Sequence, residues 1–201
     1  MFTGLIQGIG RIAHVEPLVA DGGVRITVDA SRVAGFQAHV GDSIALNGAC
    51  MTATVVEGAR FCCDVSAESL ARTCGLNAPG DVNIETSLKM GDAIGGHLVA
   101  GHVDGIGAVV RYAPVGESWE LVILAPAALA RFLAIKGSIA VNGVSLTVNR
   151  VADTAEGCKF SINVIPHTHA VTTLGGLQPG SRVNLEVDLI ARYVERMLPG
   201  R

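Results

Sequence analysis

The amino-acid sequence predicts an all-β protein made of two similar, roughly six-stranded β-barrels from an internal duplication, followed by a C-terminal α-helix. Three observations support this prediction. Residues 41–54, GDSIALNGACMTAT, reappear as GSIAVNGVSLTV at residues 137–148. Short strand-like segments alternate with turn signals every roughly 8 to 12 residues. Residues 189–198, LIARYVERML, have helical spacing and no upstream counterpart.

The duplication extends over both halves of the chain. Residues 3–10 resemble 100–107, residues 64–69 resemble 163–168, and residues 79–85 resemble 179–186. The offset of roughly 95 to 101 residues is the size of one small domain. We therefore expect a first barrel over residues 1–88, a second over 98–187 and a terminal helix over 188–201, with a glycine-rich linker over 88–97.

The first half carries the strand signals in order. Strands are expected over residues 2–15, 24–28, 43–46, 50–56, 60–65 and 82–87, with short helices over 32–36, capped by Ser31, and 68–74. Asp21-Gly22-Gly23 is a hairpin-turn signal. Asn47-Gly48 is another, because both residue types tolerate positive φ. Of the neighbours Cys62 and Cys63, we expect one to face inward and the other outward.

The second half repeats the series. Strands are expected over residues 109–112, 119–124, 138–141, 144–148, 159–165 and 183–187, with a helix over 126–132. In the tail, Ile190, Tyr193, Val194, Met197 and Leu198 form one apolar stripe of a helix. That stripe packs on its own barrel or on matching helices of other copies. We favour self-association, because both barrels look complete without the tail.

Composition excludes several function classes. The net charge is −3 and charged residues are 16% of the chain, which disfavours a surface that binds nucleic acid. No apolar run approaches the ~20 residues of a membrane helix, and the N-terminus lacks the pattern of a signal peptide. The 5 cysteines contain no C-x-x-C pair, so neither a disulfide framework nor a zinc ribbon is expected, and a reduced cytosolic setting fits best.

The duplicated motif carries the first candidates for chemistry. Cys50 in the first copy corresponds to Ser145 in the second. A position that accepts a thiol or a hydroxyl suits the wall of a polar site, although a lone cysteine is more often a small core residue. Thr52 and Thr147 lie two residues further and face the same side of their strands. From spacing alone, they bind a ligand or simply line a solvated face.

The histidines show an asymmetry between the halves. His102 occupies the position of Leu5 in the first half, which favours a role in acid–base chemistry or ligand binding. His97 lies five residues before it, a spacing that does not match a helical metal-ligand pair, and no metal site is expected. His167 and His169 flank Thr168 in a turn and can be merely solvated. No Rossmann fingerprint, nucleophile elbow or P-loop is present.

Several motifs together resemble the riboflavin synthase family of the α-chain type. They are MFTGLIQGIG, NGACMT, NGVSLTVN, GGHLVAGHVDG, VIPHT with TTLG, and VNLEVDLIARYVERML, which cover nearly the whole chain in order. The resemblance implies a cytoplasmic homotrimer held by the C-terminal helices, with lumazine synthase as a candidate partner. It implies dismutation of two 6,7-dimethyl-8-ribityllumazine molecules by four-carbon transfer, giving riboflavin and 5-amino-6-ribitylamino-uracil, without metal or other cofactor. Each barrel would bind one lumazine, and a complete site would pair two subunits.

The resemblance also assigns residues. The catalytic candidates are Phe2, Ser43, Cys50, His102, Ser145 and Thr147. The pocket of the first barrel would be lined by Gly4, Leu5, Ile6, Cys50, Met51, Thr52, Asp64, Val65, Ser66, Ala67, Glu68 and Ser69. The pocket of the second barrel would be lined by Gly101, His102, Val103, Lys136, Ser145, Leu146, Thr147, Asn163, Val164, Ile165, Pro166, His167 and Thr168.

One departure from the family pattern bears on activity. The family commonly has Asp-Gly where this chain has Asn142-Gly143, so a carboxylate that could assist deprotonation is missing. A second hypothesis is therefore a non-catalytic lumazine or flavin carrier, like the antenna proteins of luminous bacteria. The retained Cys50, His102, Ser145 and Thr147 favour the enzyme. A purely structural double barrel would leave these matched polar residues unexplained.

Overall fold

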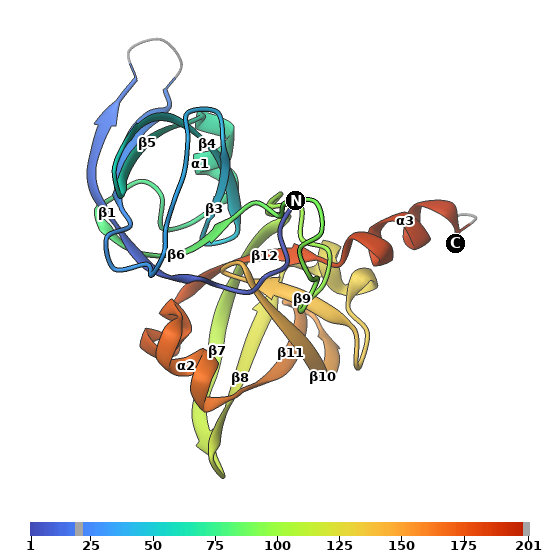
Figure 1. Cartoon of the computed structure of the whole chain (residues 1–201). Coiled ribbons are helices and arrows are strands. Elements are labelled where there is room, and N and C mark those ends of the chain that lie inside the picture. Colours follow the sequence, from blue (N-terminus) through green and yellow to red (C-terminus); the bar gives the residue numbers. More distant parts are fainter. Residues whose placement is uncertain (19–21, 199–201) are drawn as a thin grey trace.

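The computed structural model describes residues 1–18 and 22–198. In this part of the chain the strands close into two antiparallel barrels, which lie one above the other in Figure 1. The strand order is β1-β2-β5-β4-β3-β6 in the first barrel and β7-β8-β11-β10-β9-β12 in the second. Since β7 to β12 take the places of β1 to β6, the two halves share one topology. The predicted all-β fold with an internal duplication is confirmed.

The first barrel, called the N-barrel below, contains β1 (Gly8–Pro17), β2 (Val24–Asp29), β3 (Ser43–Leu46), β4 (Ala49–Glu57), β5 (Arg60–Val65), α1 (Ala67–Arg72) and β6 (Gly80–Thr86). The second, the C-barrel, contains β7 (Gly105–Val115), β8 (Ser118–Ala125), the 3₁₀ helix η1 (Ala127–Phe132), β9 (Ser138–Val141), β10 (Val144–Thr154), β11 (Gly157–Val164), α2 (Pro166–Val171), the 3₁₀ helix η2 (Thr173–Gly176) and β12 (Arg182–Val187). The tail is α3 (Leu189–Met197).

Each barrel is filled by its own apolar side chains. Alternation along β4 sends Met51 into the N-barrel core and leaves Cys50 and Thr52 on the other face. Alternation along β10 likewise places Leu146 in the C-barrel core and leaves Ser145 and Thr147 on the other face. The candidate hydroxyl and thiol groups therefore lie outside the barrel cores, where a ligand can reach them.

The two Asn-Gly hairpin turns meet between the barrels. Asn47 and Gly48 have φ values of 46° and 82°, and Asn142 and Gly143 have 46° and 79°, so the predicted turn at Asn47-Gly48 is confirmed and its copy in the second half has the same geometry. A Cβ atom on Gly48 would lie 2.7 Å from the backbone nitrogen of Gly143. The close approach of the two turns therefore requires glycine.

Two buried asparagines join the barrels reciprocally. Asn184 of β12 accepts the N–H of Cys74 at 2.7 Å and donates to the carbonyl of Asn47 at 3.0 Å. Asn83 of β6 accepts the N–H of Thr173 at 2.7 Å and donates to the carbonyl of Asn142 at 2.9 Å. Because each amide satisfies backbone groups of the opposite half, the two barrels form one packed body.

Some local predictions were wrong. Residues 32–36 form successive turns rather than a helix, because Gly35 adopts φ 69° and Arg32 reaches out to Asp81. The first strand begins at Gly8, and Phe2 forms only an isolated bridge with Val99. The helix expected over 126–132 is present as a 3₁₀ helix, whereas α2 forms where a turn was expected. The Asp21 end of the predicted turn lies outside the described residues.

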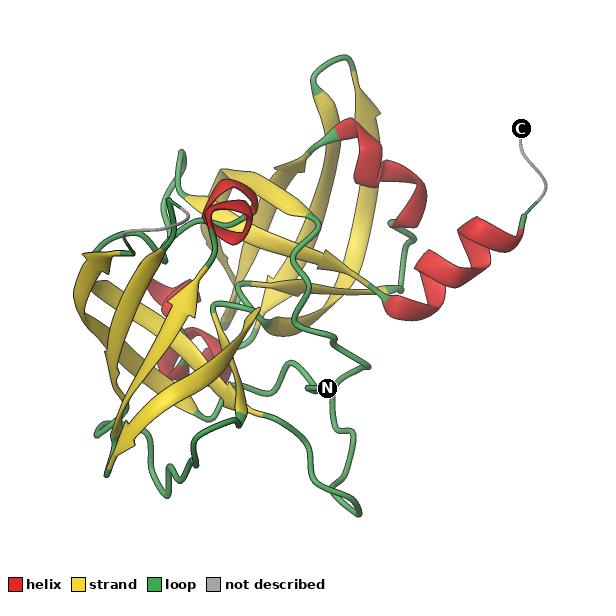
Figure 2. Cartoon of the chain, turned by 90° about the horizontal axis from the view of Figure 1, so that it is seen from above, coloured by secondary structure: helices red, strands yellow, loops and turns green. Residues whose placement is uncertain are grey.

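The terminal helix projects away from both barrels (Figures 1 and 2). Asp188 caps it by accepting the N–H of Ile190. The predicted apolar stripe is present and uncovered in the single chain: Tyr193 is 62% and Met197 82% exposed. Among the described residues, no helix has the length and apolarity needed to cross a membrane.

Candidate active site

Two extended segments cross between the barrels and organise the site. We call residues 2–7 the N-arm and residues 99–104 the C-arm. They meet at Phe2 and Val99, whose backbones exchange hydrogen bonds of 2.7 and 3.1 Å. Beyond this bridge the carbonyl of Gly4 accepts from the N–H of Ser145, and the carbonyl of Gly101 accepts from the N–H of Cys50, both at 2.8 Å. Each arm therefore lies on the barrel of the other half.

A buried glutamate anchors each arm. Glu85 accepts the N–H groups of Thr3 and Gly4 at 2.7 and 3.0 Å. Glu186 accepts those of Ala100 and Gly101 at the same distances, 2.7 and 3.0 Å. Burial raises the pKa of both carboxyl groups, against the effect of these hydrogen bonds. The nearby charge of Asp104 raises the pKa of Glu186 as well.

The arms lie so close to the opposite barrel that only glycine fits. Gly4 and Gly101 have φ values of 76° and 81°. A Cβ atom on Gly4 would lie 2.6 Å from Cβ of Ser145, and one on Gly101 would lie 2.6 Å from Cβ of Cys50. Each arm therefore fixes the position of the candidate residue beneath it, Ser145 or Cys50.

A pocket of about 390 Å³ opens beside Cys50. It is lined by the start of β4, by α1 and by the C-arm: Ala49, Cys50, Met51, Glu68, Ser69, Arg72, Thr73, Gly101, His102, Val103 and Asp104. The Cys50 thiol and the exposed His102 thus share one pocket. The volume lies in the range of small-ligand sites, and the lining mixes polar and apolar side chains.

The expected grouping of the arm residues was wrong. Gly101, His102 and Val103 were assigned to the C-barrel pocket but line the pocket of the N-barrel. Ile6 of the N-arm packs against the core of the C-barrel, whereas Val103 packs against that of the N-barrel. The physical reason is the crossing at the Phe2–Val99 bridge. A repeat identifies which residues correspond, but not which barrel each one contacts.

Other predicted residues of the N-barrel lie around the pocket rather than in its wall. Ser43 and the exposed Thr52 face one another across β3 and β4. The Asp64 carboxylate is held by Arg25 at 2.7 and 2.9 Å, and this hydrogen bond lowers its pKa. Val65 is in the barrel core, and Ser66 caps α1, which begins with Ala67. From this segment, only Glu68 and Ser69 line the pocket.

The C-barrel places a different pair at the corresponding position. The Oγ of Ser145 lies 2.7 Å from Nδ1 of His97. The His97 side chain is buried, and its Nε2 has no hydrogen-bond partner among the described residues. Burial lowers the pKa of His97, so the imidazole is neutral at neutral pH. A neutral ring beside a hydroxyl can accept its proton.

Sequence reasoning missed His97 for an identifiable reason. His97 lies in the glycine-rich linker between the two repeats, so the comparison of the two halves did not single it out. Its closeness to Ser145 follows from the fold, and no sequence pattern indicates it. The buried Phe2 was predicted as catalytic, and its ring packs between the arms beside Cys50 and Gly101.

The remaining C-barrel candidates are distributed over β10, β11 and α2. Thr147 is exposed, Leu146 is in the core, and Lys136 donates to Asn149 at 3.3 Å. Asn163, Val164, Ile165, Pro166, His167 and Thr168 form the end of β11 and the start of α2. His169, for which a merely solvated position was one interpretation, stacks on Trp119 with ring centroids 3.9 Å apart.

Asn142 does not face either candidate pair. Its Oδ1 accepts the N–H of Asn184 at 2.8 Å, as Asn47 accepts that of Asn83 at 2.9 Å. The side chain therefore closes the hairpin onto β12 at the barrel interface. An amide makes this bond as well as a carboxylate would, so the hypothesis that Asn142 marks lost chemistry gains no support from its position.

Comparison with known proteins identifies the family. The lumazine binding domain model matches residues 3–87 and again residues 100–188. The chain is 43% identical to the riboflavin synthase of Mycobacterium tuberculosis (strain ATCC 25618 / H37Rv) over 98% of both chains. It belongs to the riboflavin synthase family. The riboflavin synthases of Photobacterium phosphoreum and Bacillus subtilis (strain 168) are 36% and 34% identical, covering 98% of this chain and 89% and 90% of those relatives.

Solved structures of similar fold include LumP complexed with riboflavin, with a TM-score of 0.81, and LumP complexed with 6,7-dimethyl-8-(1'-D-ribityl) lumazine, with a TM-score of 0.78. Both comparisons cover 93% of this chain and 99% of LumP at 23% identity. At this identity the likeness concerns the fold. Within the described residues, no cluster of three or more His, Cys, Asp or Glu side chains could hold a metal ion.

Proposed function

We propose that this protein is a riboflavin synthase, a transferase of riboflavin biosynthesis. It converts two molecules of 6,7-dimethyl-8-ribityllumazine into riboflavin and 5-amino-6-ribitylamino-uracil. One molecule gives up a four-carbon unit and the other receives it, so the reaction is a dismutation that needs no external oxidant. The observation that carries the proposal is the 43% identity to a riboflavin synthase over 98% of both chains.

The geometry supports a reaction between two copies of one compound. Each half supplies a polar side chain beneath a crossing arm, Cys50 in the N-barrel and Ser145 in the C-barrel. Catalysis then depends largely on holding the two ligands in a reactive orientation. The neutral His97 is placed to accept a proton through Ser145, and His102 lies at the pocket beside Cys50.

The first experiment is incubation of the purified protein with 6,7-dimethyl-8-ribityllumazine. Riboflavin is followed by absorbance and the pyrimidine product by chromatography. Equal amounts of both products are expected. Tight binding without conversion would instead favour the carrier hypothesis, which the arrangement of Asn142 does not support.

We also propose a homotrimer in which the exposed stripe of α3 forms the contact. The support is the uncovered apolar surface of Ile190, Tyr193, Val194, Met197 and Leu198 on a helix that leaves the body of the molecule. Deletion of residues 189–201 should then give monomers with little activity. A fully active monomer by light scattering and assay would refute this assembly.

In this trimer, a complete site would combine the N-barrel of one subunit with the C-barrel of the next. The test is co-expression of two inactive variants, Gly101→Ala in the N-barrel pocket and Gly4→Ala at the C-barrel. For a site shared between subunits, random mixing restores activity to about a quarter of the wild-type value. For a site within one chain, no activity returns, and the composite site is excluded.

The division into an N-terminal lumazine-binding barrel over 1–88, a C-terminal one over 98–187 and a trimerisation helix over 188–201 is part of the same proposal. We further propose a cytoplasmic location, supported by the fact that all five cysteines, Cys50, Cys62, Cys63, Cys74 and Cys158, are free. Lumazine synthase is the proposed partner, since the enzyme that forms the lumazine would supply its substrate. Co-sedimentation of the two purified proteins tests the contact.

A further inference from the structure

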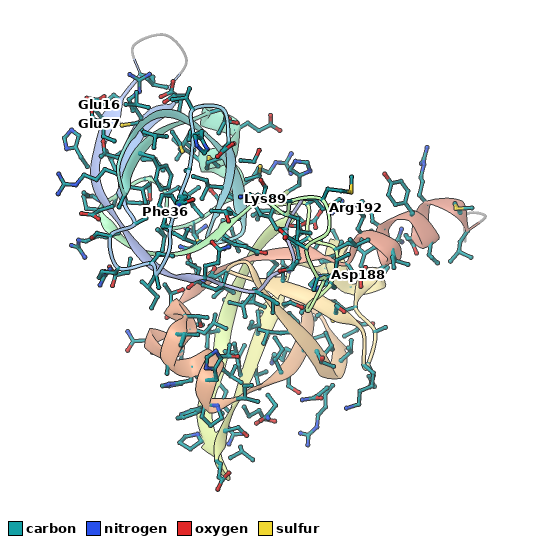
Figure 3. The ribbon with its side chains drawn as sticks, viewed as in Figure 1. Glu16, Phe36, Glu57, Lys89, Asp188 and Arg192 are labelled. Carbon is teal, nitrogen blue, oxygen red and sulfur yellow. The ribbon has the colours of Figure 1, made fainter. Side chains whose placement is uncertain are left out.

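An ion pair joins α3 to the C-arm. Both carboxylate oxygens of Asp104 lie 2.7 Å from Nη2 of Arg192, in the first turn of α3. The Asp104 side chain is only 13% exposed, and its Oδ2 also accepts the N–H of Val187 at 2.8 Å. Figure 3 shows Arg192 near the N-terminal end of α3, where the helix leaves the body of the molecule. The pair thus connects the arm, β12 and α3.

The first half of the chain, which no terminal helix follows, shows how the position of Asp104 is used in the absence of α3. Gln7 corresponds to Asp104 in the N-arm. Its Oε1 accepts the N–H of Thr86 at 3.1 Å, as Asp104 accepts that of Val187. Its Nε2 donates to the Thr86 hydroxyl at 2.9 Å. Anchoring the arm to the last strand therefore needs no charge. The charge appears only in the half that α3 follows.

The ion pair fixes one end of a segment that lines the pocket. At the other end Gly101 is held by Glu186 and by Cys50. Between these two anchors lie His102 and Val103, and both line the N-barrel pocket together with Asp104. A largely buried carboxylate is stable only with its counter-charge. Without Arg192, the carboxylate would turn toward water and displace the two residues before it.

We propose that Arg192 is a positioning residue for the N-barrel pocket, because its ion pair with Asp104 makes the seating of α3 a condition for the placement of His102 and Val103. This inference rests on the proposed function. The terminal helix then has a second role besides self-association. Within its own chain it positions residues that line the N-barrel pocket.

The same helix supplies a matched control. Glu195 of α3 pairs with Arg131 of η1 at 2.8 Å. That contact also ties α3 to the body, but neither residue lines the pocket. If α3 merely needs to be fastened, loss of either ion pair should have the same effect. If Arg192 positions the residues of the pocket, only the loss of the Arg192–Asp104 pair should lower ligand affinity.

The experiment compares Arg192→Leu, Arg192→Lys, Asp104→Gln and Glu195→Gln in the full chain. Light scattering gives the oligomeric mass, steady-state assays give kcat and KM, and titration with riboflavin gives the affinity of the pocket that Gly101→Ala abolishes. Arg192→Leu should lower kcat/KM and riboflavin affinity about tenfold, mostly through KM. In an Asp104→Gln background, where glutamine keeps the anchor to Val187 as Gln7 does for Thr86, the same substitution should have no further effect. Arg192→Lys should lose about threefold, since it keeps the charge without the planar guanidinium. Glu195→Gln should stay within about twofold of wild type.

Two outcomes overturn the inference: unchanged kcat/KM and affinity in Arg192→Leu at wild-type mass, or an equal loss in Glu195→Gln. If Arg192→Leu fails to fold or assemble, Arg192→Lys decides, because it keeps a positive charge on α3 and loses only the guanidinium. Wild-type affinity in that variant sinks the proposal. If the wild type has no synthase activity, the proposed function fails, while the riboflavin titrations still measure the positioning role.

Discussion

The N-barrel and the C-barrel share their strand order, their hairpin turns and their arm anchors, yet they differ at the site. Beside Cys50 lies a pocket of about 390 Å³ that contains His102. Beside Ser145 lies the buried imidazole of His97, 2.7 Å from the hydroxyl. The scaffold was thus kept while the functional groups diverged. This is the arrangement expected when two copies of one molecule must react in different roles.

The largest expected effect tests whether the arms hold both sites equally. Gly101→Ala and Gly4→Ala should each lower kcat/KM at least about 100-fold, because the added methyl group would displace Cys50 or Ser145. The control is Gly58→Ala, where φ is 61° but no atom lies within 4 Å. If one arm variant keeps wild-type activity, the two sites are not equivalent in their dependence on the arms.

The next effect concerns the barrel interface. Asn83→Ala should lower the free energy of unfolding by about 3 kcal/mol, since it leaves the Thr173 N–H and the Asn142 carbonyl without partners. Asn184→Ala should cost about 1 kcal/mol more, because Asn184 also donates to the Cys74 carbonyl. Urea denaturation measures both. Losses below about 1 kcal/mol would show that the amides do not hold the barrels together.

His97→Gln should lower kcat about 30-fold with little change in KM, since it removes the proton acceptor at Ser145. The exposed His14→Gln is the control. Burial lowers the pKa of His97 in the folded state below its value of ~6.5 in the unfolded chain. Below pH ~6.5 the unfolded chain therefore binds a proton that the folded protein does not, so the wild type loses stability as the pH falls toward the folded-state pKa. The variant should therefore lose less stability between pH 7 and acid than the wild type. Identical pH profiles would refute the assignment of a buried neutral imidazole.

The smallest effect asks how far the two sites are interchangeable. Cys50→Ser copies the second half into the first and should slow turnover about threefold, whereas Cys50→Ala should slow it about tenfold. Riboflavin and lumazine binding should stay largely intact in both, because the other residues that line the pocket are unchanged. Unchanged turnover in Cys50→Ala would remove Cys50 from the chemistry.

The sequence was a good guide to the scaffold because the scaffold depends on local signals. Alternation and Asn-Gly turns identify strands and hairpins, and the repeat doubled the evidence for each. The helix over residues 32–36 failed for the same local reason, since Gly35 in a left-handed conformation favours a turn.

The site was predicted less well because it depends on contacts between distant segments. His102 and Cys50 were both recognised, but their shared pocket follows from the crossing of the arms, which no local pattern encodes. The role of Asn142 was equally hidden, because its partner Asn184 lies on the last strand. Asp104 and Arg192 lie in two of the motifs that carry the family resemblance, but their pairing was not predicted, because only the fold brings them together.

The stack of Trp119 on His169 makes the two barrels optically different. Trp119 is the single tryptophan of the chain. Its indole lies 3.9 Å from the imidazole of α2, with Tyr112 on the same ring at 6.0 Å, whereas Val24 occupies the matching position in the N-barrel. Tryptophan emission from the unmodified protein therefore originates in the C-barrel alone. The unfolding of the C-barrel can thus be followed by tryptophan fluorescence, to which the N-barrel contributes no tryptophan of its own.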